Sequence, residues 1–146
     1  MTGVRTESPT LPQTLARRAN THLGVRLAAA ALLVAVAYIH FADQGFLAFA
    51  KDPAYLQVCY VIVEVLALLG AVGVLAHPAR GTWLLALGCA AGPLVAFVLT
   101  RTIGLPNATD DIGNWGEPLA VASLVVEGLL LLIALAELNR LARTPV

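Results

Sequence analysis

Charged residues are scarce in this chain. Only 12% of its 146 residues are Asp, Glu, Lys or Arg, whereas soluble proteins carry about 25%. Nine basic residues balance nine acidic ones, and no stretch interleaves basic with aromatic residues. These features exclude nucleic acid as a partner and a polybasic membrane patch. Because 59% of the residues are hydrophobic, the expected partner is the lipid bilayer.

Cysteine is almost missing as well. Cys59 and Cys89 stand alone in apolar runs, and no CxxC pair occurs. A thioredoxin-like redox site and a zinc knuckle both need such a pair. Each cysteine is therefore interpreted as a small buried hydrophobic residue, and no cofactor is predicted.

Long apolar runs are what the chain has in abundance. A helix that crosses a bilayer needs about 20 mostly apolar residues. Four stretches meet this requirement: 24–43, 54–76, 82–101 and 118–138. Because the connections are short, consecutive helices are expected to be antiparallel neighbours. The sequence therefore predicts an all-α fold, an integral membrane four-helix bundle with up-down-up-down topology.

The distribution of basic residues predicts the orientation of this bundle. Seven of the nine fall in the two tails and the second connection: Arg5, Arg17, Arg18, Arg26, Arg80, Arg140 and Arg143. Short basic segments stay on the cytoplasmic side of a membrane. We therefore expect a flexible cytoplasmic tail at 1–22, a transmembrane domain at 23–140 and a cytoplasmic tail at 141–146. The localisation predicted is the cell membrane, with both termini cytoplasmic.

A GxxxG step lies in the third span, at Gly88 and Gly92. Such a step permits close approach of a neighbouring helix. Packing inside the chain is the favoured interpretation. Contact with a second copy is the alternative, so that a homo-oligomer or a larger membrane complex stays open.

Two acidic residues fall near the middle of the bilayer. Glu64 lies ten residues into the second span and Glu127 nine residues into the fourth, which puts both about 14–15 Å deep. A charged side chain at the centre of a membrane helix costs about 2.5–3.5 kcal/mol. Both carboxyl groups are therefore expected to face the bundle interior and to meet each other there.

The other polar residues of the spans lie between these carboxyl groups and the outer boundary, while the inner halves are almost purely apolar. This pattern predicts a polar cavity that opens outward above a closed floor, with the sixteen-residue third connection folded over it. The candidate ligand-binding residues are His40, Gln57, Tyr60, Glu64, Arg101, Glu117, Ser123 and Glu127. Two of them have a simpler alternative: His40 as an interfacial side chain, and Arg101 as an anchor that snorkels and pairs with Glu117 or Asp110.

A metal site built from His40, Glu64 and Glu127 is not predicted. Counting along the helices puts His40 about 10 Å nearer the outer boundary than the carboxyl groups, too far for one coordination sphere. The sequence also has no HxxxH or ExxH motif and no His/Cys cluster.

The segment 99–128 and several positions before it carry a family resemblance. The residues are Ile39-His40-Phe41, Gln44, Thr100-Arg101-Thr102, Gly104-Leu105-Pro106, Glu117 and Glu127. With them the chain resembles, over about 27–138, a family of small four-span membrane proteins of actinobacteria and related bacteria. Glu64 departs from the family pattern, which has Gln or an apolar residue there. The resemblance implies a bacterial inner-membrane location and supplies no activity.

Two functions follow from these residues. The favoured one is a non-catalytic membrane protein that binds a small ligand, an ion or a proton in the cavity, or acts as an accessory subunit. The alternative is a membrane-embedded enzyme of the isomerase or cyclase type. It would use Glu64 and Glu127 as a catalytic acid/base pair on a lipid or quinone-like substrate.

Overall fold

The computed structural model describes the backbone of residues 11–143 and the side chains of residues 22–143. The elements are α1 (Leu11–Asp43), the 3₁₀ turn η1 (Phe46–Ala48), α2 (Ala54–Ala76), α3 (Arg80–Thr102) and α4 (Pro118–Arg143). Each of the four α-helices contains a stretch long and apolar enough to cross a membrane. Their outward faces expose mainly Leu, Val and Ile, as contact with lipid requires. The predicted all-α integral membrane bundle is confirmed.

Three helix boundaries differ from the expected ones. α1 begins at Leu11, so that the backbone of residues 11–22, expected to be part of a flexible tail, is helical. The candidate membrane span of α1 begins at His22, close to the predicted start. The helix itself can begin earlier, since Pro12 lies in its first turn, where proline is tolerated. α3 begins at Arg80 rather than 82, and α4 continues to Arg143 rather than ending at 138. The tail residues 1–10 and 144–146 lie outside the described part of the chain.

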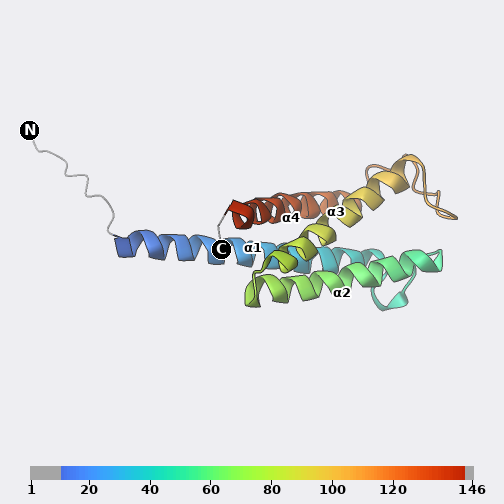
Figure 1. The fold of residues 1–146 in the computed structure, drawn as a ribbon. Helices are drawn as coiled ribbons and strands as arrows, with labels where there is room; N and C mark the ends of the chain where they lie inside the picture. The colour runs from blue at the N-terminus through green and yellow to red at the C-terminus, as the bar shows by residue number, and fades with distance from the viewer. Residues whose placement is uncertain (1–10, 144–146) are drawn as a thin grey trace, which may run out of the picture.

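The four helices pack as a ring. Each helix contacts the next one in sequence, and α4 contacts α1. α1 and α3 also approach each other across the bundle, whereas α2 and α4 stand diagonally opposite. In Figure 1, α3 meets α2 at the turn that joins them and then diverges from it toward the other end of the bundle. The two ends of the bundle are therefore packed differently.

The core occupies the half of the bundle next to the α2–α3 turn, which we call the closed half. Its buried members are Ala29, Ala30, Leu33, Val36, Ala37, Ala67, Ala71, Val74, Trp83, Ala86, Cys89, Ala90, Leu130 and Ala134. Small residues allow close approach here. A Cβ atom on Gly70 would lie 3.4 Å from the Leu33 side chain, and one on Gly73 only 2.6 Å from Thr82.

Two polar side chains are built into the closed half. Trp83 is fully buried, and its indole N–H has no hydrogen-bond partner among the described residues. The guanidinium of Arg26 donates to the carbonyl oxygens of Val74, at 2.8 Å, and Leu75. These carbonyls lie in the last turn of α2, where no further helical N–H reaches them and where a positive charge is favourable. Arg26 therefore ties α1 to the end of α2.

The prediction that the GxxxG step packs inside the chain is wrong. A Cβ atom built on Gly88 or Gly92 has no described atom within 4 Å, and both glycines are exposed. The closest approach of α2 to α3 is instead at Gly73, beside Thr82. Beyond their common turn the two helices diverge, so Gly88 and Gly92 meet no neighbouring helix.

Candidate functional site, a cavity within the membrane span

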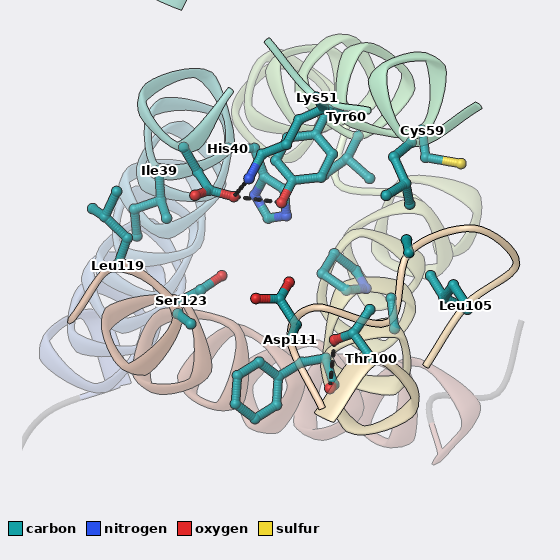
Figure 2. Close-up of a pocket in the computed structure, with 18 of the residues that line it drawn as sticks. Ile39, His40, Lys51, Cys59, Tyr60, Thr100, Leu105, Asp111, Leu119 and Ser123 are labelled. Carbon is teal, nitrogen blue, oxygen red and sulfur yellow. Dashed lines mark hydrogen bonds and ion pairs between the residues drawn. The ribbon is translucent and has the colours of Figure 1, made fainter. Parts of the chain in front are cut away.

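The other half of the bundle, which we call the cavity half, contains a cavity of about 830 Å³. All four helices and both long connections contribute to its lining. Figure 2 looks into it, with His40 and Tyr60 pointing inward from one side and Ser123 and Asp111 from the other. A polar cavity above a closed apolar half is the arrangement that the order of polar residues predicted.

Glu127 is the deepest carboxyl group of the cavity. It is 1% exposed and accepts a hydrogen bond from Ser123, one turn earlier on α4. His40 of α1 approaches the same oxygen, with Nε2 3.9 Å from Oε1. Because His40 Nδ1 lies 2.9 Å from the carbonyl oxygen of Val36, this nitrogen carries a proton and Nε2 faces Glu127. The imidazole also packs edge-on against Tyr60.

The predicted 10 Å separation of His40 and Glu127 is therefore wrong. The count assumed that α1 ends at the membrane boundary. Gln44 follows the last residue of α1 and is fully buried, so the end of this helix lies inside the bundle. His40 consequently sits deeper than its position in the sequence suggests.

Arg101 organises the rim of the cavity. Its side chain is 5% exposed, and its guanidinium contacts Asp111 at 2.7 Å and Glu117 at 2.9 Å. It also lies over the ring of Phe97, 5.1 Å from the centroid. The predicted pairing with Glu117 is present, and the second partner is Asp111 rather than Asp110. The Nε atom of Arg101 is buried without a hydrogen-bond partner among the described residues.

The third connection folds back over the cavity, as expected from its length. Gly104 starts this turn with a φ of 75°, a left-handed conformation that glycine adopts without strain. The Tyr55 hydroxyl donates to the carbonyl oxygen of Pro106 at 2.8 Å, and the Gly113 N–H donates to that of Arg101 at 3.0 Å. The connection is thereby tied to both α2 and α3.

A second ion pair lies at the rim of the cavity, next to the α1–α2 connection. Lys51 contacts Asp43 at 2.7 Å, and the Tyr60 hydroxyl donates to the same carboxylate. The Lys51 ammonium also lies 5.0 Å from the centroid of the Tyr60 ring.

Carboxyl groups outnumber basic groups around the cavity. The acidic lining residues are Asp43, Asp52, Asp110, Asp111, Glu117 and Glu127. The basic ones among the described lining residues are Lys51 and Arg101. The cavity therefore carries an excess of negative charge.

Glu64 and Gln57, both expected in this site, belong to a different cluster. Glu64 accepts a hydrogen bond from Gln44 at 2.8 Å, Gln57 donates to Gln44, and the Lys51 N–H donates to Gln57 at 3.1 Å. Neither Glu64 nor Gln57 is among the residues that line the cavity. The two glutamates stand on the diagonal helices α2 and α4, so equal depth does not bring them together.

Two features of the site were not predicted as such. Gln44 forms the centre of the α1–α2 cluster, and its position directly after an apolar span was the available signal. Pro93 lines the cavity from inside α3, where it cannot donate a hydrogen bond to the carbonyl of Cys89. A proline within an apolar helical run marks such a place.

Within residues 22–143, no group of three His, Cys, Asp or Glu side chains is arranged to hold a metal ion. Comparison of the chain with protein-family models, with curated proteins and with solved structures finds no match.

Proposed function

We propose that this multi-pass membrane protein binds a small cationic ligand in the cavity, with Glu127 as the counter-charge. The observation that carries the proposal is the position of Glu127, fully buried yet part of the cavity wall. Its contacts with Ser123 and His40 both involve Oε1. A carboxylate accepts hydrogen bonds at both oxygens, so Oε2 is left for a ligand.

The charge around the cavity supports a cation rather than an anion. Lys51 and Arg101 are already paired with Asp43, Asp111 and Glu117 at the rim. Glu127 has no Lys or Arg partner among the described residues. A buried carboxylate without a positive partner is costly, and a bound cation removes that cost.

In the membrane, we place the cavity on the outer side and residues 1–22 and 141–146 in the cytoplasm, following the basic residues of the tails. A bacterial inner membrane and membership of the four-span actinobacterial family remain predictions from the resemblance. A role as an accessory subunit, or in a homo-oligomer, is compatible with ligand binding.

The enzymatic alternative loses support from the geometry. An acid/base mechanism with paired carboxyl groups needs Glu64 and Glu127 in one site, and only Glu127 lines the cavity. His40 Nε2 lies 3.9 Å from Glu127 Oε1, so these two groups are not hydrogen-bonded to each other.

The test is equilibrium binding of three cationic probes to the full chain in lipid nanodiscs: Na⁺, tetramethylammonium and tetraphenylphosphonium. At least one probe is expected to bind saturably, and Glu127→Gln should weaken it by about 30-fold or more, as removal of one partner of a buried charge pair does. Glu64→Gln is the matched control and should bind like the original chain. Absence of saturable binding for all three probes, or equal binding by Glu127→Gln, contradicts the proposal.

A further inference from the structure

Building on the proposed function, we infer that the ligand is an organic cation with an apolar body, and that it enters from the bilayer between α2 and α3. The cationic group pairs with Glu127, and the apolar body fills the remaining cavity.

The size and walls of the cavity favour such a ligand over an inorganic ion. A volume of about 830 Å³ lies in the range of pockets that hold drug-sized molecules, about 300–1,000 Å³. Between the charged rim and Glu127, the lining side chains are mainly apolar: Ile39, Leu56, Val63, Ala96, Pro93 and Leu124. A small hydrated ion leaves these walls without apolar contacts, whereas an apolar body covers them.

Aromatic rings in the cavity already hold cations. Lys51 lies over the Tyr60 ring and Arg101 over the Phe97 ring, at 5.0 and 5.1 Å. Both rings line the cavity. An aromatic face attracts ammonium and related cations. Because Lys51 and Arg101 already occupy these two faces, the cationic group of the ligand is left to pair with Glu127, and its apolar body can contact the remaining ring surfaces.

The route follows from which lining residues are also exposed. On α2, Cys59 is exposed and Ile62 is 50% exposed, although both line the cavity. On α3, Gly92 and Ala96 are likewise exposed and line the cavity. The expectation that Cys59 is buried is thus wrong, because α2 and α3 separate at this level.

These four residues lie within the spans Ala54–Ala76 and Arg80–Thr102. Counted from the helix ends at the cavity side, they lie about 8–15 Å along the axis. An opening at this depth faces lipid rather than water. In Figure 2, Cys59 lies on the side of the cavity where α2 faces α3, and Figure 1 shows the two helices diverging from their common turn.

The first experiment tests the ligand class. Tetraphenylphosphonium is expected to bind the full chain in nanodiscs roughly 100-fold more tightly than tetramethylammonium, because its phenyl groups bury apolar surface against the walls. Two results would overturn this inference: equal affinities for the two cations, or binding of Na⁺ alone. If that binding still depends on Glu127, the proposed function stands. Absence of Glu127-dependent binding of any cation overturns both.

The second experiment tests the route. A Cβ atom on Gly92 has free space around it, so Gly92→Trp places a bulky side chain in the opening without a backbone clash. Gly88→Trp is the matched control, since Gly88 is one turn away on the same helix, equally free and exposed, and not part of the cavity lining. A side chain that narrows a route slows entry and exit alike and leaves the equilibrium nearly unchanged.

Radiolabelled tetraphenylphosphonium and rapid filtration of proteoliposomes give both rates. Gly92→Trp is expected to lower the association and dissociation rate constants about tenfold, with Kd changed less than about threefold, while Gly88→Trp matches the original chain. Rates that are equal in the two variants contradict the lateral route. If Gly92→Trp fails to yield monodisperse protein, Cys59→Trp with Val58→Trp as control applies the same test, because the exposed Cys59 lines the cavity and the exposed Val58 does not.

Discussion

Glu64 and Glu127 lie at nearly the same distance from the starts of their helices, yet they have different surroundings. Glu64 is half-buried and accepts a hydrogen bond from Gln44, which in turn accepts one from Gln57. Glu127 is 1% exposed and lines the cavity, and its polar partners among the described side chains are Ser123 and His40. The first glutamate is satisfied by neutral amides of its own hairpin. The second faces an open volume.

The difference shows that an acidic residue in the middle of a membrane helix has two possible roles. One role is to hold helices together through hydrogen bonds, which in membranes contribute modestly. The other is to present a charge where a ligand can neutralise it. Partners and cavity contact distinguish the roles, whereas depth does not.

The largest loss of stability is expected from breaking the Glu64 cluster at its centre. Gln44→Leu removes both hydrogen bonds of a fully buried side chain and leaves Glu64 and Gln57 without these bonds. We expect the free energy of unfolding to fall by about 2–3 kcal/mol, measured by thermal or denaturant unfolding in detergent. Cation binding to the folded fraction should persist. Unchanged stability would show that this cluster does not hold α1 to α2.

Ser123→Ala is expected to act on the other glutamate. The Ser123 hydroxyl donates a hydrogen bond to Glu127 Oε1. Its removal should raise the Kd for tetraphenylphosphonium about three- to tenfold, which corresponds to one ordinary hydrogen bond of about 1 kcal/mol, with little change in the free energy of unfolding. Ala122→Ser, at an exposed position outside the cavity lining, serves as control. If Ser123→Ala lowers the free energy of unfolding but leaves the Kd unchanged, the result would argue against a ligand at Glu127.

Glu117→Gln addresses the rim and should have a smaller effect. Glu117 is 36% exposed, and Arg101 keeps its contact with Asp111 when Glu117 is neutralised. Partly exposed ion pairs contribute about 0–1 kcal/mol, so unfolding should shift by no more than that. A change in cation affinity as large as that of Glu127→Gln would move the binding site from the cavity floor to the rim.

Glu64→Gln is expected to have the smallest effect of the series. The new amide oxygen can still accept the hydrogen bond from Gln44, so unfolding should change by less than about 1 kcal/mol. A loss of tetraphenylphosphonium binding in this variant would place Glu64 in the ligand site after all.

Much of the fold follows from the sequence because hydropathy and proline are local signals. The bounds of α2 and the start of α4 coincide with the predictions, at positions next to Pro53 and at Pro118. The gradient of polar residues along the spans likewise predicted a cavity above a closed half. Each of these inferences needs only the distance of a residue along its own helix.

The errors concern which face of a helix meets which neighbour. Depth gave no sign that α2 and α4 are diagonal, so Glu64 and Glu127 were wrongly expected to meet. The GxxxG motif predicted that Gly88 and Gly92 pack against a neighbouring helix of the chain, whereas no described atom lies within 4 Å of a Cβ atom built on either glycine. The depth of His40 depends on how far the end of α1 lies inside the bundle. The burial of Gln44, directly after this end, shows that depth in the structure, but the sequence does not indicate that Gln44 is buried.

The most direct test of the central claim is protection of one glutamate from a carboxyl reagent. The full chain in nanodiscs is treated with dicyclohexylcarbodiimide, which dissolves in the bilayer, and modification of each glutamate is measured by mass spectrometry of peptides. Tetraphenylphosphonium at saturating concentration is expected to suppress modification of Glu127 and to leave that of Glu64 unchanged. Modification of Glu127 that is the same with and without the cation would contradict the assignment of Glu127 as the group that binds the ligand.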